Sequence, residues 1–264
     1  MAALRIEFVK NKKCGPSKFT QEACKKNEDK NRQQSGPIQE TLEDFWHMIY
    51  TERSAVIVML CAFKEGVLQL LAIYNITSDC LGPNEKCALY HPKTTNECGK
   101  FGPYRVYLKE EKDSPITGVT YKILCAKKNR RNPFEVHHLA YTDWPDHTAP
   151  NDPTSIVAMM RFARMLAKGS TITVHCSAGI GRSATFVDYA MQRIKQDSNV
   201  TMVAILKELR EQRYQCVQGI IQYIFLHEGA VRKDELQSYF NGYRRMLALF
   251  NKKIAAKMKD KAQG

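Results

Sequence analysis

The sequence has no long apolar segment. Its longest uninterrupted apolar run covers residues 55–63, which is too short to cross a bilayer. The first residues, Met-Ala-Ala-Leu-Arg-Ile-Glu-Phe, also lack the apolar core of a signal peptide. Both absences favour a cytoplasmic protein. No internal repeat or low-complexity linker interrupts the 264 residues, which favours one folded domain with a sizeable core.

Paired-cysteine spacing is absent as well. The nine cysteines are an odd number, they are scattered, and no two of them have the C-x-x-C spacing. This pattern disfavours a disulfide framework and a four-ligand zinc site. In a reducing compartment, most of these thiols should be buried and unreactive.

Acidic residues are few relative to basic ones. The chain has 27 Asp and Glu against 40 Lys and Arg, which gives a formal net charge of +13. Such a charge predicts anionic partners in general, among them phosphorylated proteins, nucleic acid and acidic lipid. Because the chain has neither zinc-finger spacing nor the aromatic-basic pattern of RNA-recognition domains, no nucleic-acid partner is predicted.

Apolar periodicity predicts alternating strands and helices, hence an α/β fold. Residues 55–61 are rich in β-branched side chains and are typical of a buried strand. A helix is expected after the Asp-Pro pair at 152–153, ending before Gly169. The expected fold is a mixed, twisted β-sheet flanked by helices, with strands at 55–61, 106–108, 119–125, 136–141 and 171–174 and helices at 40–50, 152–167, 182–195, 200–212 and from about 218.

One segment carries recognisable chemistry. A predicted strand leads directly into Cys176, and a predicted helix begins at Arg182. The residues between them are small or flexible, so successive backbone N–H groups can turn inward and bind a dianion. The full H-C-x-x-G-x-x-R-S pattern should arise by chance on the order of once in ten thousand such chains or fewer. The segment reads His175-Cys176-Ser177-Ala178-Gly179-Ile180-Gly181-Arg182-Ser183.

Each part of this segment has a chemical use. Arg182 can grip two phosphoryl oxygens with its planar guanidinium. The loop amides and this guanidinium favour the thiolate form of Cys176, which is the nucleophilic form. Ser183 can donate a hydrogen bond to the thiolate, and His175 can brace the loop from behind. The pattern therefore predicts a cysteine-dependent phosphatase.

The segment 175–183 resembles the signature of the protein tyrosine phosphatase family, in particular its non-receptor members with one catalytic domain. Two further motifs resemble the family's acid loop and glutamine loop, and all three occur in the family's order. The likeness extends from about residue 36 to residue 229. The two further motifs are Trp144-Pro145-Asp146, and Val217-Gln218 with Gln222-Tyr223.

The resemblance implies a cysteine-phosphatase fold and hydrolysis of phosphotyrosine in proteins through a cysteinyl-phosphate intermediate. Asp146 would be the general acid and then the base, and Gln218 and Gln222 would position the attacking water. Trp144 would anchor the acid loop, and Glu65 would pair with the loop arginine. No metal or other cofactor is required.

The sequence departs from the family pattern in two places. After Lys30-Asn31-Arg32 the family continues into a tyrosine that stacks on the substrate, whereas this chain has Gln33 and then Gly36-Pro37. Residues 67–85 form an insertion. We therefore divide the chain into an N-terminal helix with a truncated recognition loop (1–35), a catalytic domain (36–240) and a basic C-terminal helix or tail (241–264).

Two alternatives to phosphotyrosine hydrolysis stay open. The missing aromatic residue favours a catalytically weak phosphate-binding pseudophosphatase, whereas the retained catalytic groups disfavour it. A dual-specificity or phosphoinositide phosphatase would keep the chemistry and change the substrate. The basic C-terminal stretch from residue 243 has helical apolar spacing, so it could pack against the domain or make a weak contact with an anionic membrane.

Overall fold

A computed structural model describes residues 36–65, 84–129, 132–144, 148–150, 153–186, 197, 199–213 and 215–230. Its main feature is a six-stranded mixed sheet with the strand order β4-β5-β6-β7-β1-β8, beside a two-stranded sheet of β2 and β3. The predicted fold class, a mixed sheet flanked by helices, is confirmed. The strands are β1 (Val56–Met59), β2 (Lys64–Glu65), β3 (Asn84–Glu85), β4 (Cys98–Phe101), β5 (Tyr104–Lys112), β6 (Val119–Lys128), β7 (Phe134–Tyr141) and β8 (Ile172–His175).

Strand β1 lies between β7 and β8 and runs parallel to both. Its four side chains are fully buried, as expected for a parallel strand covered on both faces. The continuous apolar run at residues 55–61 predicted this burial correctly. Strands β4 to β7 pair antiparallel, and buried side chains alternate with more exposed ones along the first half of β5.

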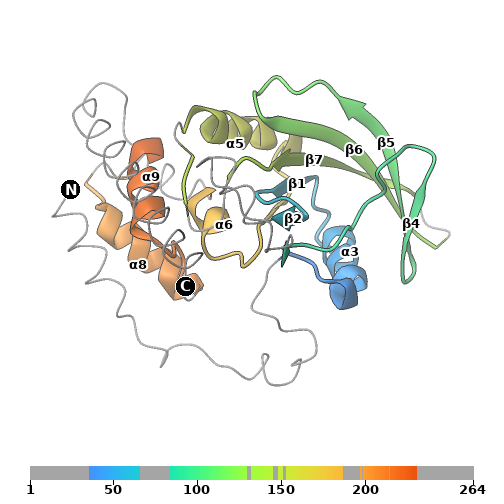
Figure 1. Cartoon of the computed structure of the whole chain (residues 1–264), viewed down its shortest axis with the longest axis horizontal. Coiled ribbons are helices and arrows are strands. Elements are labelled where there is room, and N and C mark those ends of the chain that lie inside the picture. The colour runs from blue at the N-terminus through green and yellow to red at the C-terminus, as the bar shows by residue number, and fades with distance from the viewer. Residues whose placement is uncertain are drawn as a thin grey trace, which may run out of the picture.

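Two helices cover opposite sides of the sheet (Figure 1). Helix α3 (Leu42–Thr51) follows a short 3-10 turn, η3 (Gln39–Thr41), and packs Trp46 and Ile49 into the core. Helix α5 (Thr154–Ala167) contacts β1, β7 and β8. It begins after Pro153 and ends with Lys168 and Gly169 at positive φ, which confirms the predicted bounds.

Within the described ranges, three helices follow β8 and lie on the side of the molecule away from β4 (Figure 1). Helix α6 (Arg182–Phe186) contacts α9 (Ile220–Ala230), and α8 (Met202–Gln212) shares a second apolar cluster with them. Thr201 caps α8 by accepting a hydrogen bond from the N–H of Ala204. Among the described residues, no helix is long and apolar enough to span a membrane.

Several elements were not predicted. Strand β4, with the sequence Cys-Gly-Lys-Phe, has no β-branched residue and is formed by a hairpin turn to β5 at Gly102. The pair β2–β3 joins two residues before the insertion to the last two residues of the insertion and is too short to give a periodic signal. The predicted N-terminal helix, the helix beyond residue 186 and the basic C-terminal stretch lie outside the described residues.

Candidate active site

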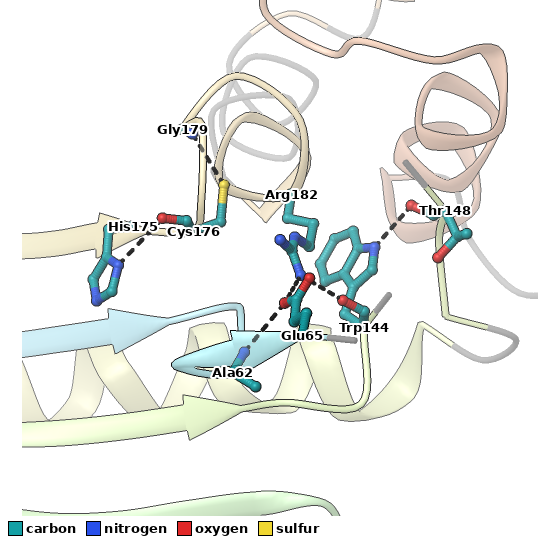
Figure 2. A network of polar contacts seen from close by, with 8 residues as sticks. All are labelled: Ala62, Glu65, Trp144, Thr148, His175, Cys176, Gly179 and Arg182. Atoms are coloured by element: carbon teal, nitrogen blue, oxygen red, sulfur yellow. Dashed lines mark hydrogen bonds and ion pairs between the residues drawn. The ribbon is translucent and has the colours of Figure 1, made fainter. Parts of the chain in front are cut away.

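The cysteine loop connects β8 to α6. Strand β8 ends at His175, and α6 begins at Arg182, so the predicted strand–loop–helix order is confirmed. Gly179 has a φ of +68°, a conformation that a residue without a Cβ adopts at little cost. This conformation brings the backbone nitrogen of Gly179 to 3.1 Å from Sγ of Cys176, and the Gly179 N–H donates a hydrogen bond to that sulfur (Figure 2). The loop backbone therefore turns toward the sulfur.

The guanidinium of Arg182 is fully buried beside the loop. Its Nη1 donates to Oε1 of Glu65 at 2.5 Å and to the carbonyl oxygen of Trp144 at 2.7 Å (Figure 2). A buried cation is costly unless it is paired, and Glu65 supplies that pair from β2. The pairing of Glu65 with the loop arginine, which the family resemblance implied, is confirmed. The backbone N–H of Ala62 donates to the same carboxylate oxygen and helps to orient it.

Trp144, at one end of the acid loop, lies close to Arg182. Trp144 is fully buried, packs on Phe225 of α9 and donates from Nε1 to the carbonyl oxygen of Thr148 at 2.8 Å. This bond joins the residues on either side of Pro145, Asp146 and His147. Those three residues lie outside the described part of the chain, so the role of Asp146 stays a prediction. The anchoring position of Trp144 follows from its burial and from its contacts.

Both predicted glutamines lie against the cysteine loop at Gly181. A Cβ at Gly181 would lie 2.7 Å from Oε1 of Gln218 and 2.9 Å from Nε2 of Gln222. The Oε1 atom of Gln222 accepts from the N–H of Gln218 at 3.0 Å, so one glutamine fixes the backbone of the other. Gln222 is fully buried, whereas Gln218 is partly exposed. Gln218 is therefore the glutamine with access to solvent.

His175 lies behind the loop, in a buried polar row. Its Nδ1 donates to the carbonyl oxygen of Cys176 at 3.4 Å, and its Nε2 accepts from the hydroxyl of Tyr90 at 2.9 Å. The Tyr90 oxygen in turn accepts from Nε2 of His138 at 2.6 Å, a set of roles in which the Tyr90 hydroxyl donates once and accepts once. Burial lowers the pKa of His175 to about 4 and holds the pKa of His138 well below its usual range. Both imidazoles are therefore neutral at physiological pH.

Two further groups touch the loop. The hydroxyl of Ser183 is buried and has no hydrogen-bond partner among the described residues, so the predicted bond to Cys176 is not formed in this structure. Gly36 donates from its N–H to the carbonyl oxygen of Ser177 at 3.0 Å. A Cβ at Gly36 would lie 2.7 Å from the Cys176 carbonyl oxygen, so this position requires glycine. Gly36 was noted in the sequence only as a family marker, and its contact with the loop was missed.

The structure contains no group of three or more His, Cys, Asp or Glu residues that could hold a metal ion, within its described ranges. His137 and His138 lie in β7, where they pair with β1 and β6. Cys87 is buried in the core, and burial raises the pKa of its thiol. Cys98 is exposed on β4, and Cys80 lies outside the described residues.

A cysteine directly after a strand, a loop turned toward its sulfur and a buried ion-paired arginine define a cysteine phosphatase site. The family model described as "Protein-tyrosine phosphatase" matches residues 27–232. The chain belongs to the protein-tyrosine phosphatase family. It is 30% identical over 204 residues to human receptor-type tyrosine-protein phosphatase C and 34% identical over 205 residues to tyrosine-protein phosphatase 99A of Drosophila melanogaster.

The same likeness holds among solved structures. The catalytic domain of human protein tyrosine phosphatase non-receptor type 18 has a TM-score of 0.62 and 27% sequence identity, over 74% of this chain and 66% of that domain. PTPN18 in complex with HER2-pY1248 phosphopeptides has a TM-score of 0.61 and 26% identity, over 74% of this chain and 68% of the other. The two curated relatives are much longer. The matches cover 76% and 74% of this chain but 14% of each of those proteins.

Proposed function

We propose that this chain hydrolyses phosphotyrosine in proteins through a cysteinyl-phosphate intermediate. The observation that carries the proposal is the position of Arg182. Its guanidinium is buried beside the loop that holds Cys176, and it is fixed there by Glu65 and by the Trp144 carbonyl. A fixed cation next to a nucleophilic sulfur suits a phosphoryl dianion, whose charge it would balance.

In the first step, the Cys176 thiolate attacks phosphorus while the bond from phosphorus to the tyrosyl oxygen breaks. Asp146 gives its proton to that oxygen, so the leaving group departs as neutral tyrosine. The amides of Ser177, Ala178, Gly179, Ile180 and Gly181 and the Arg182 guanidinium would carry the charge of the transferred phosphoryl group. The Gly179 N–H already points at the sulfur, which supports this role.

In the second step, a water molecule attacks the cysteinyl phosphate. Asp146 takes a proton from the water, the bond between sulfur and phosphorus breaks, and inorganic phosphate leaves with the thiolate restored. Gln218 and Gln222 are proposed to position this water, because both side chains lie against Gly181. Ser183 is proposed to donate a hydrogen bond from its buried hydroxyl to the departing thiolate. His175 would hold the Cys176 carbonyl in place through both steps.

We extend the proposal to the arrangement of the chain. Residues 36–240 would form the catalytic domain, preceded by a truncated recognition region and followed by a basic helix or tail. The solved PTPN18 complex contains phosphopeptides, which supports phosphotyrosyl proteins as substrates of this site. The phosphotyrosyl proteins that this chain hydrolyses need not be those of PTPN18, because residues 1–35 lack the family's stacking tyrosine.

The test is hydrolysis of p-nitrophenyl phosphate and of phosphotyrosyl, phosphothreonyl and phosphoinositide substrates, at mildly acidic pH with a chelator present. Cys176→Ser should abolish release of phosphate. Cys98→Ser, which changes an exposed cysteine on β4, should leave it unchanged. Preference for the phosphotyrosyl peptide supports the proposal, whereas equal rates on all substrates would point to a dual-specificity enzyme. A folded chain that binds phosphopeptide without turnover would overturn the proposal in favour of a binding domain.

A further inference from the structure

The residue before Gln218 has a strained backbone. Val217 has a φ of +60°, and its side chain is fully buried. A β-branched residue with this φ is an outlier, since its Cβ crowds the backbone, and such a residue persists only where its surroundings hold it. The strain lies next to the glutamine that faces solvent at the cysteine loop. This position suggests that the strained turn aims Gln218.

A buried arginine holds this turn. Arg210 of α8 is 5% exposed, and its guanidinium faces the two carbonyl groups that flank the strained residue. Its Nε donates to the carbonyl oxygen of Cys216 at 3.0 Å, and its Nη2 donates to that of Val217 at 3.2 Å. The two donors belong to one rigid plane, so they fix the relative direction of two successive carbonyl groups. A lysine could not do this, because its ammonium is a single point of contact.

The same turn is bonded directly to the cysteine loop. The N–H of Val217 donates to the carbonyl oxygen of Ile180 at 2.7 Å. On the other side, the N–H groups of Gln218 and Gly219 both donate to Oε1 of Gln222. The backbone from residue 216 to residue 219 is therefore held from three directions. The Oε1 atom of Gln218 then comes within 2.7 Å of the point where a Cβ at Gly181 would lie.

We propose that Arg210 is a positioning residue that keeps the strained turn at Val217 in place and thereby aims Gln218 at the phosphorylated cysteine. This inference rests on the proposed function, in which Gln218 positions the water of the second step. In this role Arg210 acts through the turn, by its bonds to the carbonyl groups of Cys216 and Val217. Its loss should therefore slow the breakdown of the cysteinyl phosphate more than its formation.

The experiment compares wild type with Arg210→Met and Arg210→Lys in rapid-quench kinetics with p-nitrophenyl phosphate. Arg210→Met should lower kcat by on the order of 10- to 100-fold, the cost of a small misplacement of a catalytic group. KM should fall with it, because the phosphoenzyme accumulates when its breakdown becomes the slow step. A burst of about one p-nitrophenol per enzyme should precede the steady state, and phosphocysteine should be recovered after acid quench. Arg210→Lys should show the same burst with a smaller loss of kcat.

Two controls separate positioning from a general structural effect. Lys207→Met removes an exposed cation from the same helix, α8. This variant should keep the kcat of wild type and, like wild type, should show no burst. In a Gln218→Ala background, Arg210→Met should change kcat by less than about 2-fold, because the group that it positions is already gone. An equal loss of kcat with and without Gln218 would overturn the inference, and so would a loss of kcat without a burst.

The role of Arg210 can still be tested if Arg210→Met does not fold or if wild type is inactive. If Arg210→Met does not fold, as judged by its thermal transition, unchanged kinetics in Arg210→Lys would overturn the inference. If wild type has no activity, the proposed function fails on its own. Crystal structures of wild type and Arg210→Lys then test the positioning: the inference requires Gln218 to move away from Gly181 in the variant and fails if it stays in place.

Discussion

Arg182 and Glu65 are 117 residues apart in the sequence, yet their side chains form one buried ion pair at the cysteine loop. The arginine is fully buried, and the glutamate is 7% exposed. The glutamate stands in the short strand β2, which the insertion at residues 67–85 follows directly. The site thus depends on a carboxylate beside the segment in which the chain departs from its family.

Glu65→Ala should destabilise the protein and reduce its activity. Removing one partner of a buried ion pair typically costs about 3–5 kcal/mol, because it leaves the other charge uncompensated. Arg182 would also lose the contact that fixes it beside Cys176, so kcat/KM should fall by on the order of 100-fold or more. Urea denaturation and steady-state kinetics would measure both effects.

The matched control is Glu85→Ala, on the strand that pairs with β2. Glu85 is exposed, so its removal should change the free energy of unfolding by no more than about 0.5 kcal/mol. If Glu65→Ala were as stable as Glu85→Ala, the ion pair would contribute nothing to the fold.

Gly181→Ala should impair catalysis while Cys176 stays reactive. The new methyl group would displace the side chains of Gln218 and Gln222, whose nearest atoms lie 2.7 and 2.9 Å from its position. A displacement of this size should lower kcat by on the order of 100-fold. The rate of Cys176 alkylation by iodoacetate should change little, since the thiol does not depend on the glutamines.

Gly169→Ala separates the effect of a methyl group on stability from its effect on the site. Gly169 has a φ of +87° at the end of α5, and nothing lies within 4 Å of its would-be Cβ. Alanine should cost about 1–2 kcal/mol there, because a Cβ is disfavoured at positive φ. Activity should be retained. Equal losses of kcat in the two glycine variants would contradict a specific clash at Gly181.

Stability should fall as the pH drops from about 6.5 toward 4. His175 has a folded-state pKa of about 4 against 6.5 for an ordinary histidine, so the unfolded chain takes up a proton first. Its contribution of about 3 kcal/mol is present in full above pH 6.5 and is lost as the pH falls to 4. His138 changes in the same direction, and its buried Nδ1 has no hydrogen-bond partner among the described residues that would stabilise the protonated ring. Urea denaturation between pH 8 and pH 4.5 would measure the slope.

His138→Gln separates the contribution of His138 to the pH dependence of stability from the contribution of the carboxylates. Glutamine can still donate to the Tyr90 oxygen but takes up no proton, so the loss of stability between pH 7 and pH 5 should be smaller than in wild type. The variant should also be less stable than wild type at pH 8, because the new side chain packs less well. A pH slope identical to that of wild type would show that His138 is protonated in the folded protein.

Asp146→Ala should lower kcat with phosphotyrosyl peptide by about 10²- to 10⁴-fold, the usual contribution of a general acid. The loss should be smaller with p-nitrophenyl phosphate, whose leaving group needs less protonation. The fall of activity at higher pH should also disappear, because no acid remains to be titrated. Asp143→Ala, three residues earlier, is the control and should keep both the rate and the pH profile.

The cysteine, its loop and the arginine were predictable because they form one contiguous segment. A strand, a turn containing Gly179 and a helix beginning at Arg182 follow from local residue preferences, and the same residues supply the chemistry. Helix α5 was predictable for the same reason, since Pro153 and Gly169 mark its ends. The family motifs added Glu65 and the glutamines, which spacing alone does not connect.

Residue order alone was therefore enough to predict those groups that lie within one contiguous turn of backbone. The tertiary structure decided the contacts that join distant segments: Glu65 with Arg182, Arg210 with Val217, and Tyr90 between His138 and His175. Such pairs have no sequence period, because sheet register and helix packing bring them together only after the core has formed. The strained φ of Val217 belongs to the same group, since residue preference opposes it and only the surrounding contacts maintain it.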